Sequence, residues 1–276
     1  MMFRKNQTGI AFLCGVALIT AAFVLVGCDN GTTGPNPEDQ LDSDPGTIDW
    51  GTIDFNAVSD WGSTTDTTVI GTARGDFVPP TDKISETVIG NFYADAALEY
   101  AKQTWGEPVD FALTNGGYTG VQHEGRGGGI PAGDIALNTV NSAVKSDGLY
   151  LISVSGADIK YGFERFFHHF GTNSPTEIAN VSKAVSYTIS ADKTGITEFK
   201  LNGVAIDLTD TTKKYRVCTL SFLANVSGDR TPFYQRDIDP VDKGIAFSAA
   251  VAMYIKAYGT IDPADHGLGR VSGSLD

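Results

Sequence analysis

The stretch KKYRVCTLSFLANVSGD, residues 213–229, joins a strand pattern to a short turn. Its β-branched and aromatic residues predict a strand. The Asn, Ser and Gly that follow predict a turn. Phe222 lies where the strand pattern ends, and Asp229 lies just beyond the turn. Two interpretations are open: the turn only connects two elements, or it forms one wall of a pocket for a flat ligand.

The remaining segments predict strands and helices in mixed order. Apolar runs predict strands within residues 67–73, 109–117, 149–156, 184–190 and 196–201, and Asn202-Gly203 favours a tight hairpin turn after the last of these. Apolar spacings of three and four predict helices within 81–106, 156–170 and 242–259. Ser85 is expected to cap the first helix, and Gly106 to end it. Because no regular βαβ alternation appears, the fold class is α+β, with layered mixed β-sheets and helices.

The N-terminus predicts an exported lipoprotein. Arg4 and Lys5 precede an apolar run that ends at Cys28, which is the pattern of a secretory signal. The tetrapeptide LVGC at its end resembles a bacterial lipobox, in which the cysteine is lipidated. We therefore expect a signal peptide at residues 1–27 and lipid on Cys28, holding the protein on a bacterial membrane, facing the periplasm or the cell surface. A single transmembrane anchor is the alternative, because the apolar run is nearly long enough to span a bilayer.

Residues 28–66 are rich in Gly, Pro, Asp, Asn, Ser and Thr, and they predict a flexible tether. The repeat TIDWGTIDF within it contains Trp50 and Phe55. We interpret it as a partly ordered tail, with a short strand or a docking segment as alternatives. The folded domain is expected to cover residues 67–276.

Charge and motif content exclude several functions. The formal net charge of −13, with no basic stripe to offset it, argues against nucleic-acid binding because an acidic surface repels phosphates. Outside the predicted signal and lipobox, Cys218 is the one remaining cysteine, which is too few for a disulfide or a thiolate metal site. His168 and His169 are adjacent and would point apart on a helix. No P-loop, GxSxG or HExxH motif occurs. We predict no metal site, no cofactor and no catalytic residue.

Six segments in one order resemble the C-terminal domain of the 5′-nucleotidase and UDP-sugar hydrolase family. They are ETVIGNFYADAALEYAK, DFALTNGG, GGIPAGDI, LYLISVSGADIKYGFE, KYRVCTLSFLAN with the later GD, and AVAMYIKAYGTIDP. The resemblance covers residues 67–272. In that family an N-terminal metallophosphoesterase domain holds two metal ions and hydrolyses the substrate, and the C-terminal domain grips the nucleoside. The stretch between Cys28 and the resemblance is too short to supply both ions, so this chain alone is not expected to be catalytic.

The resemblance implies a nucleoside site with two stacking rings, an acid, and basic and Asn side chains around them. Phe222 matches one ring and Asp229 the acid, although the turn between them is one residue longer than the family's. Stacking on a ring contributes about 1–3 kcal/mol per base, and a carboxylate accepts hydrogen bonds from hydroxyls. The alternative is that Phe222 is a core residue and Asp229 caps the turn.

Asn115, Gly116 and Gly117 match the family's Asn-Gly-Gly, but the arginine that should follow is absent from its place. Arg126, in an inserted stretch, is the candidate for its role, or else an exposed loop residue. Lys83 falls at or beside a second family arginine, where it keeps the charge without the planar fork.

The family's other stacking ring is missing. The matching stretch contains Val144, Lys145 and Ser146 instead. Tyr118 in the inserted stretch is a possible substitute.

Three functions remain open. The first is an envelope lipoprotein that binds a nucleoside or nucleotide. The second is a subunit of a split 5′-nucleotidase that works with a separate metallophosphoesterase in nucleotide catabolism. The third is a surface interaction protein whose ligand site has degenerated.

Overall fold

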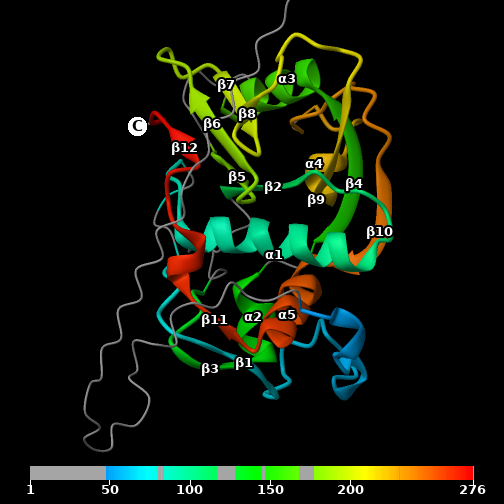
Figure 1. The fold of residues 1–276 in the computed structure, drawn as a ribbon, viewed down its shortest axis with the longest axis vertical. Helices are drawn as coiled ribbons and strands as arrows, with labels where there is room; N and C mark the ends of the chain where they lie inside the picture. Colours follow the sequence, from blue (N-terminus) through cyan, green and yellow to red (C-terminus); the bar gives the residue numbers. More distant parts are fainter. Residues whose placement is uncertain are drawn as a thin grey trace, which may run out of the picture. The chain divides into compact units, whose positions relative to one another are not determined.

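The structure, a computed structural model, describes residues 48–79, 82, 84–116, 128–144, 147–167, 177–229 and 231–275. Within them, three β-sheets and a set of helices form the fold, as Figure 1 shows. This architecture confirms the α+β class expected from the sequence.

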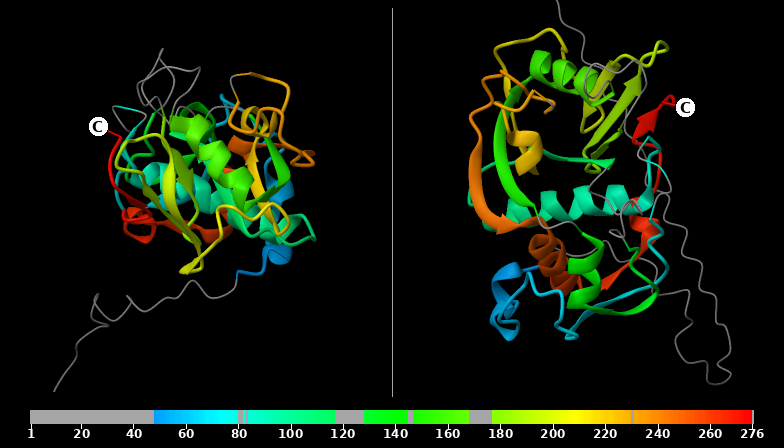
Figure 2. Two further views of the ribbon diagram at one scale, coloured as in Figure 1. Left: turned by 90° about the horizontal axis from the view of Figure 1, so that it is seen from above. Right: turned by 180° about the vertical axis from the view of Figure 1, so that it is seen from behind.

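The largest sheet has five strands in the order β10 (Val241–Ala246), β4 (Gly148–Ser155), β9 (Lys214–Leu220), β2 (Phe111–Asn115) and β5 (Ala179–Val181). A second sheet has the order β12 (Val271–Ser272), β6 (Val185–Ile189), β7 (Ile196–Leu201) and β8 (Val204–Ala205). A third has the order β11 (Thr260–Ile261), β1 (Val69–Ala73) and β3 (Gly133–Ala136). The last strand, β12, pairs in parallel with β6, and both lie near the marked C-terminus in Figure 2.

The helices are α1 (Val88–Thr104), α2 (Leu137–Ala143), α3 (Gly156–Phe167), α4 (Ser221–Ala224) and α5 (Phe247–Tyr258), with 3-10 turns η2 (Trp50–Thr52), η3 (Phe55–Ala57) and η6 (Pro263–His266). Helix α1 crosses the middle of the fold, between the five-stranded sheet and the group formed by α2, α5 and β1 (Figure 1). The core therefore continues across both sides of this helix.

Helix α1 is buried on almost every side, which its sequence explains. Gly90, Ala94, Ala96 and Ala97 lie around the aromatic side chains of Phe92 and Tyr93, and all six residues are buried. The prediction that Ser85 caps the helix is wrong, because the hydroxyl of Thr87 accepts the N–H of Gly90 instead. Ser85 lies further back and donates its backbone N–H to Asp82.

The structure corrects part of the prediction of a flexible tether, because the segment after residue 47 packs on the domain. Trp50 and Val58 are buried against the domain, and the Trp50 ring meets Tyr100 of α1 at 6.0 Å between centroids. Asp49, Asp54, Asp60 and Asp66 each accept a backbone N–H two residues further on, which shapes the segment as a series of turns. Residues 48–66 therefore pack on the domain as a docking segment, because two large apolar side chains outweigh the polar composition around them.

The predicted hairpin is present between β7 and β8. Asn202 and Gly203 both have positive φ, at 52° and 77°, which is the backbone of the tight turn that Asn-Gly favours.

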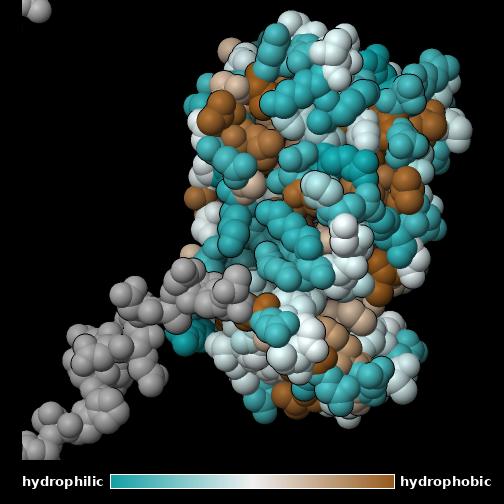
Figure 3. Space-filling view, turned by 45° about the vertical axis from the view of Figure 1, so that its right-hand side comes forward, coloured by the Kyte–Doolittle hydropathy of each residue, from teal (hydrophilic) through white to brown (hydrophobic). Residues whose placement is uncertain are grey.

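The face of the molecule drawn in Figure 3 is mostly polar, with apolar residues in small separate patches among hydrophilic ones. Among the described residues, no helix combines the length and the apolar character that a membrane crossing requires. The predicted signal peptide and Cys28 lie outside the described residues.

Candidate functional site

Sheet topology brings several candidate residues to one edge of the five-stranded sheet. Strands β2 and β9 are parallel, with Leu113 opposite Thr219, so both end at this edge. Strands β4 and β5 run the other way and begin there, with Leu149 opposite Leu220 and Ala179 opposite Asn115. The strand ends therefore place Asn115 at the same edge as α4, which follows β9 directly and carries Phe222.

Phe222 is half-buried, in contrast to the two residues that follow it in α4. Leu223 and Ala224 are buried in the core, while Phe222 packs against the core from its margin. The strand pattern in the sequence reaches Phe222, but the strand ends at Leu220 and one helical turn follows it. The ring is thus partly accessible at the edge, which is compatible with stacking and with a packing role.

Asp147 holds the beginning of α4. Its carboxylate accepts the hydroxyl of Ser221, the backbone N–H of Gly148 at 2.9 Å and that of Phe222 at 3.4 Å. Its backbone carbonyl accepts the N–H of Phe247 at 2.7 Å, at the start of α5. Asp147 therefore joins the beginnings of β4, α4 and α5.

The turn after α4 is capped by Asn225 and not by Asp229. The side-chain oxygen of Asn225 accepts the N–H groups of Ser227 and Gly228 at 2.9 and 3.2 Å. The backbone carbonyl of Asp229 accepts Arg165, and the exposed carboxylate makes no hydrogen bond or ion pair with any other described residue. Among the described residues, the side chain that caps this turn is therefore Asn225.

Arg165 in α3 fixes the far end of this turn. Its Nε donates to the carbonyl of Thr231 at 2.9 Å, and its Nη2 donates to the carbonyl of Asp229. The guanidinium also lies 5.7 Å from the ring centre of Tyr161 and 5.4 Å from that of Tyr234. Such cation–π contacts restrict the orientation of the guanidinium. Arg165 therefore binds this end of the turn from a fixed position.

Asn115 is buried, and only one of its two side-chain polar atoms has a hydrogen-bond partner among the described residues. Its Nδ2 donates to Glu177 Oε1 at 2.9 Å, but its Oδ1 has no hydrogen-bond partner among the described residues. The backbone N–H of Gly116 donates to the carbonyl of Ile178 at 3.0 Å. A buried amide oxygen without a donor is uncommon in a folded protein, and the Asn141 Oδ1 atom shares this feature within the described residues.

Lys83, Gly117, Arg126 and the possible ring substitute Tyr118 lie outside the described residues. Of the predicted set, the strand ends place Asn115, Gly116 and Phe222 at one edge of the large sheet, and Asp229 follows in the turn after α4.

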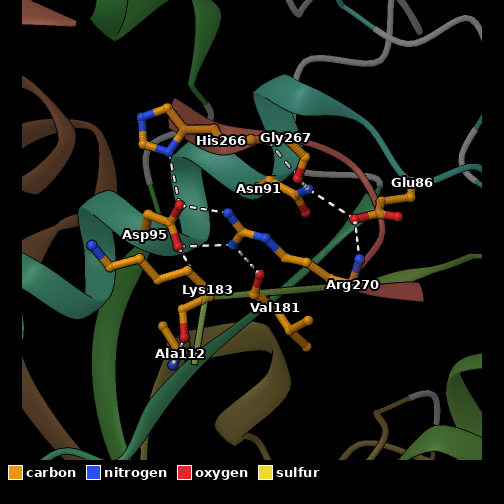
Figure 4. Close-up of polar contacts among 10 residues, drawn as sticks. Glu86, Asn91, Asp95, Ala112, Val181, Lys183, His266, Gly267 and Arg270 are labelled. Carbon is orange, nitrogen blue, oxygen red and sulfur yellow. Dashed lines mark hydrogen bonds and ion pairs between the residues drawn. The ribbon is translucent and has the colours of Figure 1, made fainter. Parts of the chain in front are cut away.

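Sequence reasoning missed the most connected polar cluster of the described fold, which Figure 4 shows. Asp95 of α1 accepts Arg270 twice, at 2.8 and 2.7 Å, and His266 Nδ1 lies 2.7 Å from its Oδ2. Glu86 accepts the backbone N–H groups of Gly269 and Arg270, both at 3.0 Å, and the side chain of Asn91 at 2.9 Å. The cluster fastens residues 266–271 to α1, which is a structural task.

Burial alone would raise the pKa of Asp95, but the hydrogen bonds and charges of His266 and Arg270 outweigh it and hold the pKa below its ordinary value. The signal in the sequence was Asp95, an acid within the apolar pattern of the helix at 88–104. A buried acid requires a buried partner. Within the described ranges, no three His, Cys, Asp or Glu side chains are grouped to hold a metal ion.

The comparisons with known proteins agree with this topology. The sequence profile described as "5'-nucleotidase, C-terminal domain" matches residues 69–235. No curated protein matches by sequence. The fold is similar to a 5′-nucleotidase precursor from Thermus thermophilus, with a TM-score of 0.59 and 21% identity over 74% of this chain and 39% of that one.

Two further solved structures share the fold. A Haemophilus influenzae NAD nucleotidase aligns with a TM-score of 0.55 and 13% identity, covering 75% of this chain and 38% of its own. A Thermus thermophilus sulfate thiohydrolase in complex with glycerol aligns with a TM-score of 0.53 and 16% identity, covering 75% and 35%. The chain thus spans less than two fifths of the length of each of these proteins.

The sheet order and the edge described above define an α+β domain of the 5′-nucleotidase C-terminal type. Because the profile covers more than half of the chain, this chain belongs to the 5′-nucleotidase C-terminal domain family.

Proposed function

We propose that this protein binds a nucleoside or nucleotide at the edge of the five-stranded sheet, with Phe222 stacking on the base and Asp229 accepting hydrogen bonds from ligand hydroxyls. The observation that carries the proposal is a partly accessible ring at one end of a turn and, at the other end, a carboxylate that no described residue engages. An aromatic face takes any base, and a carboxylate suits a sugar diol.

Asn115 supports the same proposal from the neighbouring strand end. Its buried Oδ1, which receives no donor from the described residues, is a ready acceptor for a polar ligand group. Lys83 and Arg126 remain candidates for contacts to an anionic or ribose group, as the family resemblance implies. We further propose that lipid on Cys28 anchors the protein to a bacterial membrane, which mass spectrometry of the mature N-terminal peptide tests.

The central test is calorimetric titration of the purified protein with adenosine, AMP and UDP-glucose. Phe222→Ala should weaken binding about five- to 150-fold if the ring stacks on the base. Phe55→Ala is the matched control, because Phe55 is also half-buried but lies in the docking segment. Asp229→Asn is compared with Asp134→Asn, another exposed aspartate. No heat with any ligand at millimolar concentration refutes the proposal and favours a surface interaction protein.

A second candidate is one part of a split 5′-nucleotidase. The observation that favours it is the shared fold, which aligns with 39% of the Thermus thermophilus 5′-nucleotidase precursor. A separate metallophosphoesterase would then supply the metal ions and the hydrolysis. Phosphate release from AMP should appear only when that partner is added, and Phe222→Ala should reduce it. Release by this protein alone would contradict the split-enzyme candidate.

A further inference from the structure

We propose that Asp147 and Arg165 are positioning residues that hold the two ends of residues 221–229, so that the Phe222 ring and the Asp229 carboxylate keep a fixed spacing. The inference rests on the proposed function, since the spacing matters only for a ligand that meets both groups. Neither residue contacts the ligand in this scheme. Each acts through the segment that it anchors.

The first anchor is required because α4 is too short to hold itself. It has four residues, and its N-cap residue Leu220 offers no side-chain hydrogen bond. A single helical turn is not stable alone. The carboxylate of Asp147 supplies the missing acceptor by taking the Ser221 hydroxyl and the Phe222 N–H. The orientation of the Phe222 backbone therefore depends on Asp147.

The second anchor lies at the other end of the segment. Arg165 donates to the backbone carbonyl of Asp229 and so holds the main chain of that residue in place. The direction of the Asp229 side chain then follows from the position of its main chain. A second hydrogen bond to the Thr231 carbonyl, with the two tyrosine rings around the guanidinium, fixes the arginine itself. The position of the Asp229 carboxylate therefore depends on Arg165.

The turn between the anchors is rigid enough to transmit their positions. Asn225 accepts the N–H groups of Ser227 and Gly228, and the hydroxyl of buried Thr231 contacts the carbonyls of Asn225 and Gly228. A segment fixed in this way before binding loses little conformational entropy on meeting its ligand. The two anchors thus serve affinity through preorganisation.

The two anchors should affect different parts of a ligand. Asp147 orients the ring, so Asp147→Asn should weaken free adenine and adenosine alike, by about fivefold, because a charged acceptor is replaced by a neutral amide. Arg165 positions the Asp229 carboxylate, so Arg165→Met should weaken the binding of adenosine and leave the binding of adenine unchanged. Arg165→Lys should recover part of the adenosine affinity, since one donor is kept.

The decisive experiment is a pair of double-mutant cycles measured by calorimetry with adenosine and adenine. Asp147→Asn should have no further effect in a Phe222→Ala background, and Arg165→Met none in an Asp229→Asn background. The matched controls are Asp110→Asn and Arg216→Met. Asp110 accepts the backbone N–H of Arg216 at 2.7 Å at the opposite end of β9, and Arg216 pairs with Glu107 there. Neither control should change affinity.

Equal losses in both backgrounds, or losses matched by the controls, would overturn the inference, because they would indicate general destabilisation. Hydrogen exchange at the backbone of residues 221–229 in the ligand-free protein separates this inference from the proposed function. Faster exchange in Asp147→Asn and Arg165→Met, but not in the controls, supports the anchoring even if no nucleoside binds. Unchanged exchange refutes it.

Discussion

The guanidinium of Arg270 and the carboxylate of Asp95 form a two-point ion pair inside the protein, with N–O distances of 2.8 and 2.7 Å. The side chains are 9% and 5% exposed. His266 contacts the same carboxylate, and the backbone N–H of Lys183 donates to it at 2.6 Å. Both carboxylate oxygens are thus engaged by more than one partner, which is the condition for a buried pair to be tolerated.

Removing one partner of this pair should be costly. Asp95→Asn or Arg270→Met leaves a buried charge without compensation, and we expect the free energy of unfolding to fall by about 3–5 kcal/mol. Urea denaturation followed by circular dichroism measures it. Glu198→Gln is the control, because its pair with Lys200 is about 40% exposed and should be worth under about 1 kcal/mol. Similar losses in the two variants would contradict this account.

Acid should destabilise the protein through Asp158. Burial would raise the pKa of this group, but hydrogen bonds from Ser155, Lys214 and Arg236 lower it to about 2. A carboxylate with a lowered pKa in the folded state stabilises the fold above its ordinary pKa near 3.8, and this contribution is lost as the pH falls towards 2. It should amount to about 2 kcal/mol. Unfolding free energies at pH 7, 4 and 3 should decline less steeply in Asp158→Asn. An unchanged pH slope would count against this role.

The docking segment should contribute to stability. Trp50 is buried against Tyr100, so Trp50→Ala should lower the free energy of unfolding by about 3–5 kcal/mol. Half-buried Phe55 should cost less when truncated to alanine. Thermal melts of both variants, and of a chain that begins at residue 67, make the comparison. If the shortened chain is as stable as the full one, residues 48–66 do not stabilise the domain, and the prediction of a flexible tether up to residue 66 stands.

Gly90 should not tolerate alanine, although alanine is normally the better helix former. An added Cβ would lie 2.4 Å from Oδ1 of Asn180, which is buried in β5. The usual gain of about 1 kcal/mol for Gly→Ala within a helix should therefore become a loss. Thermal melts of Gly90→Ala measure the sign. A higher melting temperature would mean that Asn180 moves aside freely.

Local patterns in the sequence were sufficient for much of the fold. The Asn202-Gly203 turn, the paired strands at 185–189 and 196–201 and the long helix before Gly106 all follow from periodicity and turn chemistry. The boundary of the strand before α4 could not be obtained in this way. Its end at Leu220 depends on Asp147, which is distant in sequence and supplies the acceptors for the next turn.

The candidate site shows the same division. Phe222 and Asp229 were accessible to sequence reasoning through their resemblance to the family pattern. Asp147 and Arg165 were not, because they contact backbone groups and, for Asp147, a serine hydroxyl 74 positions away, and no local pattern in the sequence indicates such contacts. The cluster around Asp95 was missed for a related reason, since its partners lie at the far end of the sequence.

The Asp95–Arg270 pair also has a consequence for synthesis on the ribosome. The two residues are 175 positions apart, so at about 5–20 residues per second the acid is made roughly 10–35 s before its partner. During that interval α1 carries the negative charge of Asp95, and the arginine that will pair with this charge in the interior has not yet been made. The buried ion pair, and with it the packing of residues 266–271 against α1, can therefore form only after Arg270 has been made and has left the ribosome.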